Sequence, residues 1–262
     1  MEQPPPILDP QPETALPTMS LWARLFNVLA TPGEVFQQIR TSRVSNANWL
    51  VPGIILILVS WIGAWVVFSQ DSIQQQLREI TDQAIEKQIE KGKLSEQQAE
   101  QARAAAAKFG TLGPKIGAIV APVWVGLVIP FWWGLILWFI GSKPLKGSLS
   151  YMKAVEIAGL SSMVSTLDSI LRALMILITG SLFASPSLVM FVKQFDPQNP
   201  VHGLLTAFNI ITFWVLLVRA IGVARVTQSS FAKAAVWVFG IWVFSTALFA
   251  GLGLAVQRIF SR

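Results

Sequence analysis

The sequence contains no cysteine, one histidine and one tyrosine among its 262 residues. Without cysteine, no disulfide or thiolate metal site can form, and a single histidine, His202, excludes clusters of histidine ligands. Charge is also scarce, since only 13% of the residues are Asp, Glu, Lys or Arg, about half the share of a typical soluble domain. With 53% apolar residues, this composition favours a polytopic membrane protein over a soluble domain or a disordered chain.

The motifs of common enzymes are missing as well. There is no P-loop, and the stretch Gly159–Met163 departs from the G-x-S-x-G pattern at its last position. Gly251-Leu252-Gly253 lacks the third glycine of a dinucleotide-binding turn. We therefore expect no enzymatic activity, no cofactor and no metal.

The net charge of +6 is not gathered into a basic run or stripe. A dispersed basic excess favours loops that face anionic membrane lipids, and it argues against a nucleic-acid partner.

The N-terminal region divides into two parts before the first apolar run. Residues 1–18 are proline-rich and polar, which predicts a disordered tail. Residues 19–48 predict two short amphipathic helices, the first capped by Ser20 and the second beginning at Thr31-Pro32. Both helices could lie on the membrane surface or pack against the loops of the protein itself. On the first alternative, the side chains that contact the membrane are Trp22, Phe26 and Phe36.

The remaining chain, residues 49–262, predicts an all-α transmembrane bundle. Five segments approach or exceed the roughly 20 apolar residues that a membrane-spanning helix needs, and they cover about residues 49–69, 116–140, 154–182, 203–224 and 234–256. Between the first two spans, residues 70–115 carry seven basic and seven acidic side chains, with Gly92 near the middle. This insert predicts a helical hairpin outside the bilayer.

Charged residues inside spans are rare and are candidates for function. On the third span, Asp168 and Arg172 are four residues apart, the spacing of a pair on one helix. They belong to a polar stripe that must face protein or water: Ser161, Ser165, Asp168, Arg172 and Thr179. Glu156 and Arg219 lie near the same ends of the third and fourth spans, about 3 and 8 Å deep at roughly 1.5 Å per residue. We therefore expect an ion pair between these two helices.

Lys and Arg residues give the orientation of the chain. With the N-terminus in the cytoplasm, eight lie in inner segments and three in short outer segments, although hairpin residues near span ends bring the comparison to eight against seven. The rule favours a cytoplasmic N-terminus, and five spans then place the C-terminus outside.

Three stretches resemble the Yip (Ypt-interacting-protein type) domain family in its bacterial form. They are LFNVLATPGEVFQQIR at 25–40, GKLSEQQAEQA at 92–102 and WVLLVRAIGVARVTQSSFAKAAVWV at 214–238. The resemblance implies a five-helix bundle with a cytoplasmic N-terminus, in the inner membrane of a bacterium. Eukaryotic members are associated with small GTPases and vesicle traffic, but the Asp-Leu-Tyr-Gly-Pro motif typical of them is missing here.

Two functions are compatible with these features. The first is a non-enzymatic Yip-like membrane protein that organises or recruits protein partners. The second is a small-solute transporter or permease subunit that uses the polar stripe of the third span.

Overall fold

The computed structural model describes residues 19–192, 195–196 and 199–260, with side chains up to residue 255. The predicted tail, residues 1–18, lies outside the described residues. The elements in chain order are α1 (Leu21–Ala30), α2 (Pro32–Thr41), α3 (Ala47–Phe68), α4 (Asp71–Glu90), α5 (Glu96–Phe109), α6 (Leu112–Leu127), α7 (Ile129–Ser142), α8 (Tyr151–Thr179), the short 3₁₀ helix η1 (Leu188–Phe191), α9 (Pro200–Ala207), α10 (Ile210–Thr227) and α11 (Phe231–Phe260).

Within the described residues, five helical segments are long and apolar enough to cross a membrane, which confirms the all-α polytopic class. They are α3, the pair α6–α7 (Leu112–Ser142), α8, α10 and α11 as far as Ala255. The second span is interrupted at Val128, two residues before Pro130, because proline has no N–H to continue the helical hydrogen bonds.

The fourth span starts later than the expected residue 203. Residues 200–207 form the separate helix α9, and α10 begins only after Asn209. The Asn209 side chain accepts a hydrogen bond from the Ile211 N–H at 2.7 Å, and this cap sets the start of the span.

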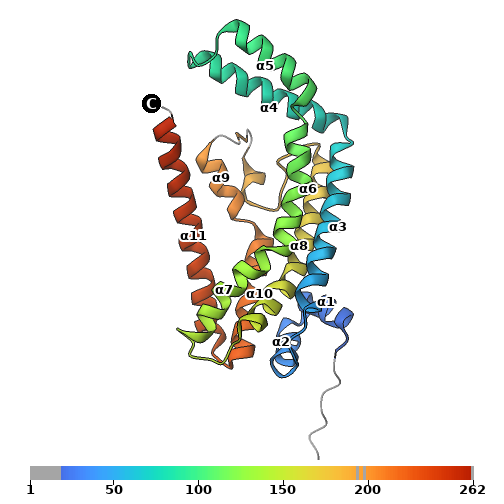
Figure 1. Ribbon diagram of the computed structural model, residues 1–262, viewed down its shortest axis with the longest axis vertical. Coiled ribbons are helices and arrows are strands. Elements are labelled where there is room, and N and C mark those ends of the chain that lie inside the picture. Colours follow the sequence, from blue (N-terminus) through green and yellow to red (C-terminus); the bar gives the residue numbers. More distant parts are fainter. Residues whose placement is uncertain (1–18, 193–194, 197–198, 261–262) are drawn as a thin grey trace, which may run out of the picture.

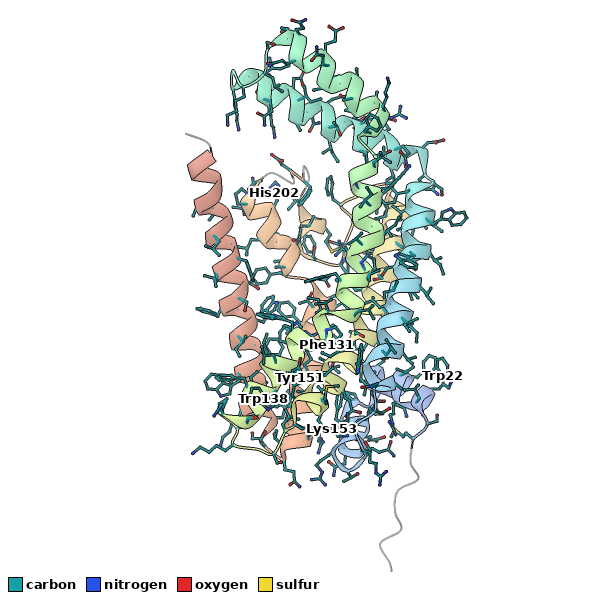
Figure 2. The ribbon with its side chains drawn as sticks, viewed as in Figure 1. Trp22, Phe131, Trp138, Tyr151, Lys153 and His202 are labelled. Atoms are coloured by element: carbon teal, nitrogen blue, oxygen red, sulfur yellow. The ribbon has the colours of Figure 1, made fainter. Side chains whose placement is uncertain are left out.

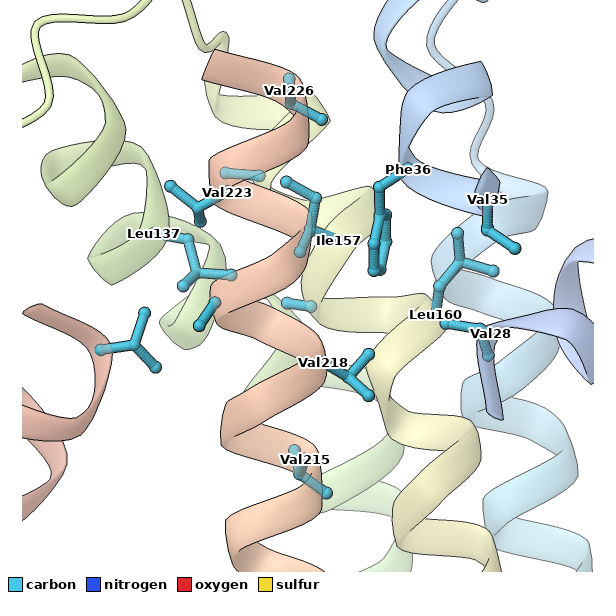
Figure 3. Packing of buried hydrophobic residues seen from close by; sticks show 14 of the residues in the cluster. Val28, Val35, Phe36, Leu137, Ile157, Leu160, Val215, Val218, Val223 and Val226 are labelled. Carbon is cyan, nitrogen blue, oxygen red and sulfur yellow. The ribbon is translucent and has the colours of Figure 1, made fainter. Parts of the chain in front are cut away.

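Helix α8 occupies the centre of the bundle and packs against α1, α2, α3, α7 and α10 (Figure 1). Every residue from Lys153 to Val164 is buried. Around α8 lies one hydrophobic core, to which α2 contributes Phe36 and α10 contributes Val218 and Val223 (Figure 3). The N-terminal helices are therefore part of the bundle core and not appendages to it.

The hairpin insert forms as expected, with α4 and α5 at the end opposite α1 and α2 (Figure 1). Gly92 has a φ of +66° in the turn, a conformation that L side chains rarely adopt. Ser95 and Gln98 form a reciprocal capping box at the start of α5. The base of α4 packs its Ile73 and Leu77 against Ile176 of α8.

Helices α3 and α6 cross at two glycines. A Cβ atom placed on Gly126 would lie 2.7 Å from the backbone oxygen of Gly53 and 3.0 Å from the Ile57 side chain. Small residues permit such close backbone approach in membranes, where dispersion contacts hold helices together.

We therefore expect Gly126→Ala to lower the stability of the bundle. The added methyl group has no space, and overpacking of this kind costs about 1–3 kcal/mol. Gly117→Ala, on the same helix with nothing within 4 Å of the new Cβ, is the matched control and should be neutral or slightly stabilising. Thermal unfolding of both variants in detergent tests this, and equal melting temperatures would contradict the crossing.

Candidate functional site

A buried carboxylate, Glu156 of α8, lies at the centre of a polar network near α1 and α2. Its side chain is fully buried, and its Oε1 accepts hydrogen bonds from the Ser45 backbone N–H at 2.8 Å and from the Asn48 Nδ2 at 2.7 Å. The Lys153 ammonium lies 2.9 Å from Oε2. Oε2 has no hydrogen bond of acceptable angle, so the attraction between the two charges is what holds it. Such pairing is what makes a charge tolerable in a buried environment.

The partners of Glu156 extend the network into the N-terminal helices. The Lys153 ammonium donates to the Ile39 carbonyl at 2.8 Å and lies 3.3 Å from the Ser42 hydroxyl. The Arg24 Nη1 of α1 donates to the Asn48 Oδ1 at 3.3 Å. We call Arg24, Asn48, Lys153 and Glu156 the clamp. It ties α1, the end of α2 and the start of α3 to α8.

The expected ion pair between Glu156 and Arg219 does not form. The Glu156 carboxylate is already paired with Lys153 within the clamp. The Arg219 guanidinium lies instead over the Trp133 ring of α7, 4.1 Å from its centroid. The prediction considered depth along each helix but not the two closer groups, Lys153 and Asn48, that compete for the carboxylate.

The expected pair within α8 is present but loose. The Arg172 Nη2 lies 3.9 Å from the Asp168 Oδ2, and both side chains are partly exposed. Asp168 has a second partner, because the Asn209 Nδ2 donates to its Oδ1 at 2.9 Å. Asn209 thus both caps α10 and binds α8.

The other members of the polar stripe do not share one environment. Ser161 is fully buried, Ser165 is half-buried and Thr179 is exposed. The Ser161 and Thr179 hydroxyls donate to carbonyls one turn back in α8, at 2.6 and 2.7 Å. A hydroxyl contact between helices is made instead by Ser60 and Ser169, 3.1 Å apart.

Of the three apolar residues expected at the membrane surface, two are exposed and one is buried. Trp22 is 60% exposed and Phe26 is 64% exposed, so both stay available for membrane contact. Phe36 is fully buried, and its assignment to the surface is wrong. Its ring lies beside Gly222 of α10, where a Cβ would come within 3.2 Å of the ring; the missing side chain makes the space that Phe36 fills.

The two ends of the bundle differ in charge. We call the end formed by α1, α2, the loop 143–150 and the turn 228–230 the basic end; Figure 2 labels Trp22 and Lys153 there and His202 near the opposite end. Among the described residues, this end and the adjoining ends of α8, α10 and α11 carry two acids, Glu34 and Glu156, against eight basic residues: Arg24, Arg40, Arg43, Lys143, Lys146, Lys153, Arg225 and Lys233. The hairpin at the opposite end is balanced, seven to seven.

Sequence reasoning missed most of the clamp. Lys153 is three residues before Glu156 and could have been paired with it from spacing alone. Asn48 and Ser45 lie more than 100 residues from Glu156 in the chain, and no local pattern connects them. Among the described residues, no group of three or more His, Asp or Glu side chains could hold a metal ion.

The comparison with known protein families gives a match over most of the chain. Residues 26–252 match the Yip1 domain. The chain belongs to the Yip1 family. The match runs from within α1 to within α11, so it includes Asn48, Lys153 and Glu156 of the clamp and reaches all five membrane-spanning segments. No curated protein and no solved structure matches the chain. Together with the five apolar helices, membership of the Yip1 family makes this an integral membrane protein.

We expect Lys153→Met to destabilise this Yip1 protein strongly. It leaves the Glu156 carboxylate buried without a counter-charge, and breaking a buried pair from one side costs about 3–5 kcal/mol. Arg172→Met removes a loose, partly exposed pair on the same helix and should cost about 1 kcal/mol or less. Thermal unfolding in detergent compares the two; a similar loss in both variants would show that the clamp contributes no more than a surface pair.

Proposed function

We propose that this protein is a non-enzymatic member of the Yip1 family that organises or recruits protein partners at the membrane through its basic end. In this proposal the basic end faces the cytoplasm of a bacterial cell, the protein lies in the inner membrane, and the C-terminus is outside. The observation that carries the proposal is the clamp, which fixes α1 and α2 against the bundle while Trp22 and Phe26 remain exposed.

The charge at the two ends supports this orientation. Basic residues gather in cytoplasmic segments next to spans, and the basic end has eight of them among its described residues. Lys and Arg in the other segments and near the span ends of the hairpin number seven, so the count of eight against seven favours a cytoplasmic basic end by one residue. A cytoplasmic basic end would also lie against anionic lipids, which attract Lys and Arg near the membrane surface.

The surface of the basic end is suited to binding because hydrogen bonds and buried contacts hold its helices against the bundle. The segment from Ser42 to Asn48 is held by the clamp, so α1 and α2 do not have to order themselves when a partner arrives. Exposed aromatic side chains beside arginines are typical of binding surfaces, for lipid as for protein. Trp22 and Phe26 would anchor this surface at the lipid interface, so that Arg40 and Arg43 face the partner. Loss of the two aromatic anchors would therefore weaken recruitment.

The absence of cysteine allows the orientation to be tested directly. Single-cysteine variants Arg43→Cys, at the basic end, and Lys93→Cys, in the hairpin turn, are both exposed positions. With an impermeant maleimide on intact spheroplasts, we expect labelling of the hairpin variant and protection of the basic-end variant until the membrane is opened. The reverse pattern would contradict a cytoplasmic basic end.

Recruitment is tested by comparing two aromatic changes. Proximity labelling from a fusion to the full chain should give a reproducible set of neighbours, which Trp22→Ser/Phe26→Ser should reduce severalfold. Phe109→Ser removes an equally exposed aromatic residue, 62% exposed, from the hairpin and should leave the set unchanged. An identical set in all three proteins would contradict recruitment through the basic end, and solute flux with Asp168→Asn/Arg172→Gln would then test the transporter alternative.

A further inference from the structure

Arg219 of α10 is the buried basic residue that the clamp does not use. Only 6% of its surface is exposed, and its Nε is enclosed without a hydrogen-bond partner. Its guanidinium lies 4.1 Å from the centroid of the Trp133 ring. This contact stabilises the cation through the π face of the indole ring without using an N–H donor of Arg219 in a hydrogen bond to an oxygen.

The acids within the spans are committed to other partners. Glu156 is bound by Lys153, Asn48 and the Ser45 N–H. Asp168 is bound by Arg172 and Asn209. Within the described part of the spans, the charge of Arg219 is therefore left without a counter-ion, and isolated charges in a membrane are costly.

Arg219 lies about two helical turns of α10 from the basic end, and its side chain is buried there. It lies eight residues before the last residue of α10, Thr227, at the basic end. At roughly 1.5 Å per residue this is about 12 Å, which is less than half of a hydrocarbon layer about 30 Å thick. Flexible arginine side chains and local thinning of the bilayer bring such residues into contact with lipid headgroups.

We propose that Arg219, which lies over the Trp133 ring, binds a phosphate group that enters from the basic end. The guanidinium offers a planar fork of donors that matches two phosphate oxygens, which is why arginine is favoured for phosphate recognition. The phosphate is carried either by a phospholipid headgroup or by a soluble ion. This site is independent of the recruitment proposed above, since it uses neither Trp22 nor Phe26.

The test measures binding to the delipidated full chain in detergent. The probes are phosphatidylglycerol, diacylglycerol without a phosphate, and inorganic phosphate; the readouts are the thermal unfolding midpoint and adduct formation in native mass spectrometry. We expect a phosphate-bearing probe to raise the midpoint of the wild-type protein and diacylglycerol not to. A response to phosphatidylglycerol alone identifies the lipid headgroup, and an equal response to inorganic phosphate identifies a soluble ion.

Two variants and one control assign the binding to Arg219. Arg219→Gln should weaken binding of the phosphate probe at least about tenfold, because it removes the charge and the fork. Trp133→Leu keeps the charge and should weaken binding to a smaller degree, and it serves if Arg219→Gln does not fold. Arg172→Gln, which removes a partly exposed arginine, should bind like the wild type. Wild-type affinity in both Arg219→Gln and Trp133→Leu, or no binding of either phosphate probe to the wild type, would overturn the proposal.

Discussion

The structure depends on one buried carboxylate. Glu156 lies on α8, the helix around which the bundle packs, and its oxygens are bound by groups from the start of α3 and from α8 itself. Lys153, held by this carboxylate, in turn binds the end of α2. Burying a charge of each sign is unfavourable unless each group is paired and hydrogen-bonded. The arrangement therefore forms only when α1, α2, α3 and α8 are all in place, so the network selects one position for the N-terminal helices.

This constraint connects the interior of the protein to its basic end. Leu25 and Val28 of α1 and Phe36 of α2 are fully buried, so hydrophobic packing and the clamp act on the same two helices. With one face committed to the core, the other face keeps Trp22 and Phe26 at the surface. The exposed face of α1 and α2 therefore lies at the end of the bundle that is rich in basic residues. The recruitment proposal rests on this combination of an ordered surface and positive charge.

Structural features that depend on neighbouring residues in the chain could be predicted from the sequence. Contacts between segments far apart in the chain could not. Apolar length predicted the five spans, and the capping residue Ser20 was predicted correctly. The spacing of Asp168 and Arg172 also predicted their pairing. In contrast, Glu156 was paired with Arg219 from depth alone, although Asn48 and Lys153 lie closer to it. The pattern of α2 predicts Phe36 at the surface, but its ring fills the space beside Gly222 of α10. That space exists only where α2 contacts α10, and the sequence of α2 alone does not indicate this contact.

The central claim is that the Glu156 carboxylate couples α3 to α8 through Asn48. A double-mutant cycle with Asn48→Ala, Glu156→Gln and the combined variant, measured by unfolding in detergent, tests it most directly. Because the Asn48 Nδ2 donates a hydrogen bond to the Glu156 Oε1 at 2.7 Å, we predict a coupling energy of about 0.5–3 kcal/mol between the two side chains. Effects that add to within about 0.5 kcal/mol, as independent sites do, would contradict the clamp.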